Sequence, residues 1–246
     1  MKRLRFQLLL GAGLILLSGV LFTVHYGIYH DARFIADWFL GSIAFLPISV
    51  LFVTIILDRV IAGREKEILM GKLNMVVGAF FSETGGRVIS LLVGDATVSD
   101  AIMPSLLPGL KWEKKDFAAS AKALGGYFYG FDARSMDLTA IRDLLASKRE
   151  FLLRLLENQN ILEHETFTDL LWALFHVTEE LESRKNLKKL SQADLAHISG
   201  DIQRAFVLIV VEWIKYMGHL KNQYPYLYSL AVRTNPFDVK AEAEIK

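Results

Sequence analysis

The chain has 246 residues, of which 52% are hydrophobic and 22% charged, and its 28 basic and 27 acidic side chains give a formal net charge of +1. This balance offers no bulk attraction for a phosphate backbone, so a nucleic-acid partner is not expected. The sequence contains no cysteine, which excludes disulfides, thiolate metal sites and cysteine nucleophiles.

Two segments near the N-terminus are long and apolar enough to cross a membrane. Phe6 to Val24 and Trp38 to Leu57 contain no charged residue. A helix rises about 1.5 Å per residue, so about twenty residues span the roughly 30 Å hydrocarbon core. The first segment is longer than a signal-peptide core, and no small-residue cleavage site follows it. Residues 1–57 are therefore predicted to form an uncleaved transmembrane helical hairpin.

The basic residues around these segments predict their orientation. Lys and Arg favour the cytoplasmic side of a membrane. They stand before the first span and after the second, whereas the connecting loop has only Arg33. We therefore expect a multi-pass protein in contact with the lipid bilayer, with both termini cytoplasmic.

Small residues recur within the two spans at intervals of seven. They are Gly11 and Ser18 in the first span and Ser42 and Ser49 in the second. Small residues let transmembrane helices approach closely, so we interpret them as transmembrane packing positions within the hairpin. The alternative is a homo-oligomeric pore lined by Ser42 and Ser49. Neither span carries a central charge, which argues against a selective pore.

Helical periodicity continues beyond the second span. Residues 58–86 are expected to extend that helix to the SETGG stretch, where Gly85 and Gly86 are a helix-stop signal. Residues 87–236 are expected to form a cytoplasmic helical bundle, and residues 237–246 a polar tail. The predicted fold class is all-α, although residues 87–136 show little regular pattern and could include a strand.

Three long helices are predicted in the second half of the bundle. The first runs from Leu138 to about Asn158 and the second from Ile161 to about Arg184. The third begins at a capping box, Ser191 to Asp194, and ends near Tyr224, because Pro225 follows.

The second of these helices is amphipathic. At about 100° per residue, Asp169, His176 and Glu179 fall on the side opposite the apolar residues, as on an ordinary solvated face. A carboxylate-bridged di-metal bundle uses Glu-x-x-His twice, whereas only the reversed spacing His176-x-x-Glu179 occurs. These two residues are kept as metal-ligand candidates, with the solvated face favoured and no cofactor predicted. Trp172 lies on the same polar side and is a candidate partner-binding residue.

The third helix has a polar stripe beside a fully apolar segment. The stripe consists of His197, Asp201, Arg204, Glu212, Lys215 and His219. Ala205 to Val211 is apolar all round, which is typical of a buried helix. Glu212 and Lys215 are three residues apart, so they can pair, and burial would require it. This stripe is the best candidate for a site, and an ordinary intrahelical ion pair is the alternative.

The strings LNMVVGAFFSETG, EHETFTDLLWALFH and YPYLYSLAVRTNPF together resemble an uncharacterised family of bacterial membrane proteins. In that family a two-span N-terminal anchor precedes a helical cytoplasmic domain. The resemblance covers most of the chain after residue 30. It implies a bacterial cytoplasmic (inner) membrane and no particular activity.

Three functions remain open on the sequence. The first is a membrane-anchored interaction or signalling module that binds a protein partner or itself. The second is a small homo-oligomeric channel, and the third is a membrane-bound metal-dependent enzyme that uses His176, His197, Glu212 or His219. The chain lacks the P-loop, GxGxxG, GxSxG and HExxH patterns, which places the enzyme last.

Overall fold

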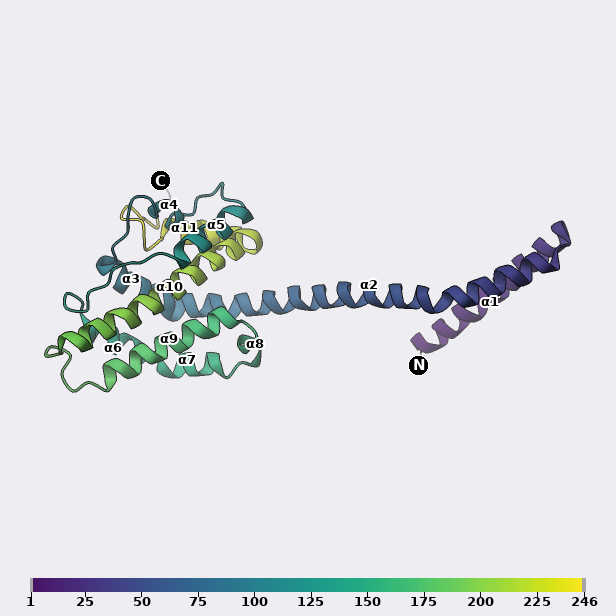
Figure 1. The fold of residues 1–246 in the computed structure, drawn as a ribbon. Helices are drawn as coiled ribbons and strands as arrows, with labels where there is room; N and C mark the ends of the chain where they lie inside the picture. Colours follow the sequence, from purple (N-terminus) through teal and green to yellow (C-terminus); the bar gives the residue numbers. More distant parts are fainter. Residues whose placement is uncertain (1, 245–246) are drawn as a thin grey trace. The chain divides into compact units, whose positions relative to one another are not determined.

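The computed structural model describes residues 2–244, and every regular element in that range is helical (Figure 1). The all-α prediction is therefore confirmed. The chain divides into two compact units, Met1–Lys66 and Glu67–Lys246. We call them the N-terminal and C-terminal units and describe each by itself.

The N-terminal unit contains α1 (Lys2–Tyr29) and the first part of α2 (Ala32–Phe80). By length and composition, Leu9–Tyr29 and the helix that begins at Ala32 are each able to cross a membrane. Between them His30 has a positive φ of 54°. The Asp31 carboxylate then accepts a hydrogen bond from the Phe34 amide at 3.0 Å, which caps the start of α2.

Aromatic rings pack the hairpin near its turn. The rings of Phe22 and Trp38 lie 5.7 Å apart, and those of His25 and Phe34 are stacked at 5.4 Å. Ser18 lines a cavity beside these rings. A Cβ atom added to Gly11 would meet no atom within 4 Å in the described chain, so this glycine makes no close helix contact there.

The α2 helix does not stop at the predicted glycines. It passes into a π-helical turn, η1 (Phe81–Gly85), and then into α3 (Gly86–Leu92). Gly85 and Gly86 both keep right-handed helical dihedrals near φ −60°. A Cβ atom on Gly85 would lie 2.6 Å from the Phe80 ring. The predicted helix stop is therefore wrong, because Gly85 makes room for buried aromatic rings within a helix that continues.

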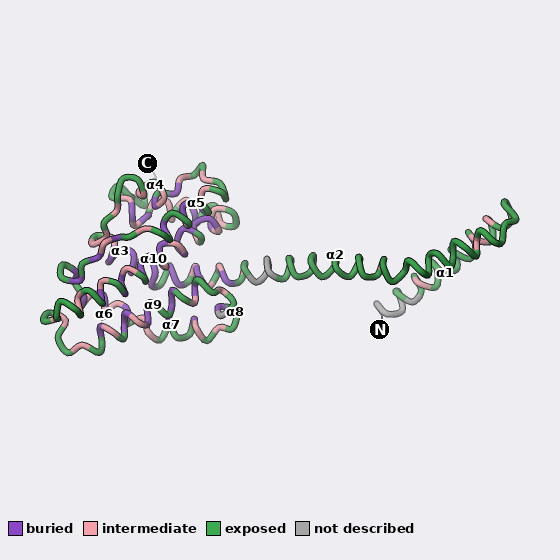
Figure 2. Tube along the Cα trace, viewed as in Figure 1, coloured by how far each residue is buried: buried purple, intermediate pink, exposed green. Residues whose placement is uncertain are grey.

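The remaining helices of the C-terminal unit are mostly short. They are η2 (Val93–Asp95), α4 (Met103–Leu106), α5 (Lys114–Gly125), α6 (Leu138–Ser147), α7 (Arg149–Leu156), α8 (Gln159–Leu162), α9 (Glu165–Glu182), α10 (Gln192–Gln223) and α11 (Pro225–Arg233). The α10 helix is central and packs against α3, α5, α9 and α11. Figure 2 shows buried segments along α9 and α10, and Phe206 and Ile209 of α10 are fully buried.

Two of the predicted helices are divided. The helix predicted from Leu138 to Asn158 breaks at Lys148, whose backbone leaves the helical region at ψ 2° and separates α6 from α7. The next begins as α8, and α9 starts only after His164, whose ring nitrogen accepts from the Phe167 amide at 3.3 Å. The third predicted helix is confirmed, since Ser191 caps α10 and Pro225 opens α11.

Candidate functional site

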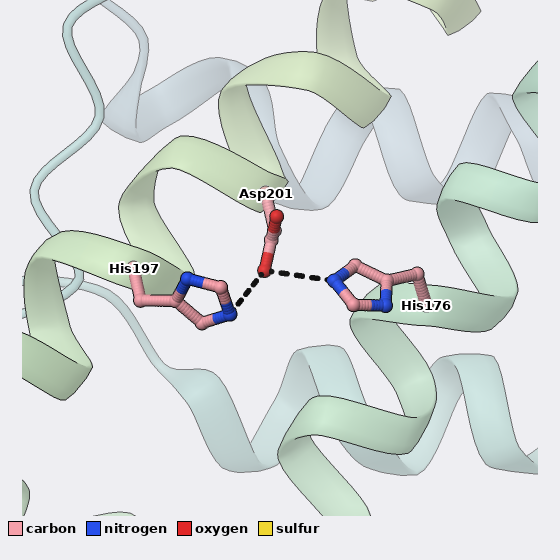
Figure 3. Close-up of side chains that lie close together, drawn as sticks. All are labelled: His176, His197 and Asp201. Atoms are coloured by element: carbon pink, nitrogen blue, oxygen red, sulfur yellow. Dashed lines mark ion pairs between the residues drawn. The ribbon is translucent and has the colours of Figure 1, made fainter.

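A histidine–aspartate cluster lies where α9 meets α10. It consists of His176 on α9 and of His197 and Asp201, one turn apart on α10 (Figure 3). The Asp201 Oδ2 atom lies 3.2 Å from Nε2 of His176 and 3.2 Å from Nε2 of His197. Each of the three residues offers one ligand atom, and these atoms lie within 4.8 Å of one another. Two imidazoles therefore converge on one carboxylate oxygen.

The packing of α10 explains this convergence. Asp201 lies one helical turn before the apolar segment that begins at Ala205, on a part of α10 that packs against α9, and only 4% of its side chain is exposed. The His176 and His197 side chains are 44% and 53% exposed. The predicted solvated face of α9 is thus partly covered at His176, because the central helix packs beside it.

The Asp201 carboxylate has one partly engaged oxygen and one without a hydrogen bond. Arg204 Nη1 lies 3.3 Å from Oδ1. The Oδ2 atom is buried and has no hydrogen-bond partner among the described residues. Buried polar atoms are normally satisfied, so an orphaned carboxylate oxygen between two imidazoles calls for an explanation.

A second acidic group lies beside the cluster. Glu180 Oε2 accepts a hydrogen bond from Arg184 at 2.6 Å and lies 3.6 Å from His197 Nε2. This hydrogen bond, more than any other contact, holds the pKa of the Glu180 carboxyl below its ordinary value. Arg184 also contacts Asp194 at 3.1 Å. Glu180 is therefore held ionised and makes the surroundings of His197 more negative.

The structure does not bring His176 into a site with Glu179. Glu179 instead pairs with Arg149 of α7 at 3.4 Å. The partners of His176 are on another helix, which spacing along α9 could not reveal. Sequence analysis already placed His197 and Asp201 on one face of the third helix; what it missed is that His176 of α9 faces this pair.

Glu212 and Lys215 form a separate network in the core. The Glu212 carboxylate is 2% exposed and accepts from Lys215 Nζ at 2.7 Å and from Thr166 Oγ1 at 2.6 Å. His164 Nε2 lies 3.9 Å from the other carboxylate oxygen. The expected pair is present, but only its acidic member is buried, since the Lys215 side chain is 42% exposed.

The remaining candidates lie in different places. His219 lines a cavity with Tyr216 and Tyr224, and burial lowers the pKa of its imidazole. Trp172 is 61% exposed and lines a groove that also includes His176 and Arg204. The residues of the polar stripe of α10 therefore lie in three separate environments, namely the histidine–aspartate cluster with Arg204, the Glu212 network and the His219 cavity.

Comparison with known proteins places the whole chain in one family. Residues 69–233 match the family profile described as "Uncharacterized protein MJ1433, C-terminal helical domain", and residues 2–61 match "MJ1433, N-terminal helical domain". The protein MJ1433 of Methanocaldococcus jannaschii is 40% identical over 238 residues, which cover 96% of this chain and 95% of the relative. The predicted membership of an uncharacterised family is thereby confirmed. That relative is archaeal, so the bacterial origin and the membrane location stay predictions. No solved structure matches the chain.

Proposed function

We propose that this chain, which belongs to the family of protein MJ1433, is a membrane-anchored module whose helical C-terminal unit acts in the cytoplasm as an interaction or signalling domain. The N-terminal hairpin serves as the anchor, and both termini lie on the cytoplasmic side. Because the relative is archaeal, the location that we propose is a prokaryotic cytoplasmic membrane and not specifically a bacterial inner membrane.

The observation that carries this proposal is the exposure of large apolar side chains along both N-terminal helices. Ile15 is 77% exposed, Leu16 71% and Leu40 68%, and many neighbours are similar. Contiguous apolar patches on soluble monomers rarely exceed a few hundred Å². Each Å² of apolar surface removed from water contributes about 25 cal/mol. A bilayer removes this surface from water without requiring any protein partner.

The interaction role is supported by the groove that contains Trp172. This indole is 61% exposed, and Ala173, Val207 and Leu208 add apolar surface to the same groove. Partly exposed tryptophans bordering a groove are frequent anchors of protein interfaces. A membrane tether also raises the local concentration of such a domain around partners in the same membrane.

The anchor is tested by membrane fractionation and by topology reporters on the full chain. Reporters inserted after His30 and fused to the C-terminus are expected to lie on opposite sides of the membrane. The protein should stay in the membrane pellet after an alkaline wash, and a variant with arginine at both Leu16 and Leu51 should be released. A wild-type chain released by the wash, or a C-terminus outside the cytoplasm, would refute the anchor.

The partner face is tested by crosslinking in native membranes. A defined adduct, either with a second copy or with another protein, is expected for the wild type and should be lost in Trp172→Ala. Phe128→Ala is the matched control, because that ring is 73% exposed and does not line this groove. Equal adducts in both variants would refute a role for Trp172.

A further inference from the structure

We propose that His176, His197 and Asp201 bind one divalent transition-metal ion, with Zn²⁺ as its representative. The ligand atoms are Nε2 of each imidazole and Oδ2 of the carboxylate (Figure 3). The proposal is independent of the membrane anchor, because all three residues belong to α9 and α10 of the C-terminal unit.

The distances between the ligand atoms suit such an ion. Zinc binds histidine nitrogen and carboxylate oxygen at about 2.0–2.2 Å, so two ligand atoms of a tetrahedral site lie about 3.3 Å apart. Asp201 Oδ2 is 3.2 Å from each of the two Nε2 atoms. Each of the three side chains places one ligand atom within 4.8 Å of those of the other two. Both imidazoles are about half exposed, and the proposal requires their side chains to rotate toward one another.

The burial of Asp201 provides an independent observation. Its Oδ2 atom is buried between the two imidazoles and has no hydrogen-bond partner among the described residues. A buried carboxylate oxygen that makes no hydrogen bond is unfavourable, even though Arg204 lies beside the other oxygen. A dication would neutralise it and would use the lone pairs of both Nε2 atoms. Arg204, 3.3 Å from Oδ1, orients the carboxylate so that Oδ2 is left for the ion.

The ligand set selects the class of metal. Imidazole nitrogens suit Zn²⁺ and other first-row transition metals, whereas Mg²⁺ and Ca²⁺ prefer sites made only of oxygen. Three protein ligands leave at least one coordination position for water or another ligand, as in catalytic rather than structural zinc sites. His176 and Arg204 also line the groove of Trp172, so an additional ligand can approach from that groove. The cationic Arg204 favours an anionic ligand there.

The competing arrangement is a simple ion pair, in which a protonated imidazole neutralises Asp201. It uses the same residues but takes up no metal. The two arrangements differ in stoichiometric zinc binding, and that difference can be measured directly.

The test is zinc titration of the full chain in detergent, purified with a histidine-free tag and stripped with chelator, followed by calorimetry and elemental analysis. One Zn²⁺ per chain is expected, with no competition from Mg²⁺ in excess. His176→Gln and His197→Gln should each weaken binding at least about tenfold, since even residues that only support metal ligands have effects of this size.

Two control variants separate this site from other histidines and acids of the chain. Glu179→Gln changes the acidic neighbour that pairs with Arg149, and His219→Gln changes a histidine in a different cavity. Both should bind zinc like the wild type. If an Asp201→Asn variant fails to fold because Asp201 is buried, the histidine variants still test the site, since both histidines are about half exposed. Absence of saturable binding, unchanged binding in both histidine variants, or equal loss in the controls would overturn the proposal.

Discussion

The Glu212 network predicts that truncating its two charged side chains, Glu212 and Lys215, will lower the free energy of unfolding by unequal amounts. Lys215→Ala would leave the Glu212 carboxylate, which is 2% exposed, with only Thr166 and the more distant His164 beside it among the described residues. Removing one partner of a buried pair typically costs about 3–5 kcal/mol. Glu212→Ala instead leaves a lysine that is 42% exposed and can turn to water. The Glu212→Ala change loses hydrogen bonds to a charged group, each of which contributes about 1.5–3 kcal/mol. It also removes the cost of burying the carboxylate, which offsets part of that loss. We therefore expect a net loss of stability of about 2 kcal/mol.

Sequence analysis treated the two residues as a pair that is buried or exposed together, whereas the structure buries only Glu212. The assay is urea unfolding of the full chain in detergent, followed by the fluorescence of tryptophans such as the buried Trp213. The double variant should lose less stability than the sum of the two single losses. The reasoning is refuted if Glu212→Ala is the more destabilising change, or if both losses are additive and below about 1 kcal/mol, the range of exposed pairs.

Two further predictions concern packing and pH. Gly85→Ala should lower the stability by about 1–3 kcal/mol through overpacking, because the new Cβ would lie 2.6 Å from the Phe80 ring. Gly94→Ala is the control: its Cβ would meet nothing within 4 Å, so thermal unfolding should change little. Equal effects of the two changes would contradict the packing argument. Burial lowers the pKa of His219 in the folded state, so the unfolded chain binds more protons, and stability should fall as the pH drops below about 6.5. His219→Gln should flatten that part of the melting-temperature profile, and an unchanged profile would exclude this histidine as its cause.

Local signals in the sequence determined the helical class and several helix ends. The apolar spans need only length and composition, and Leu9–Tyr29 qualifies on that basis. Ser191 caps α10 through its own hydroxyl, which accepts from the Asp194 amide at 3.1 Å, and Pro225 opens α11. These features depend on residues within one turn of each other, so periodicity and capping rules identify them.

Tertiary packing decided what local rules left open or predicted wrongly. Gly85 and Gly86 look like a helix stop, yet the space around the Phe80 ring determines their role. Thr166 was not singled out in the sequence, but the meeting of α9 with α10 brings it to Glu212. In the same way, His176 lies near Asp201 only because the two helices pack together. The polar stripe of α10 was visible in the sequence, but its division into three environments was not, since each part faces a different neighbour and periodicity describes one helix at a time.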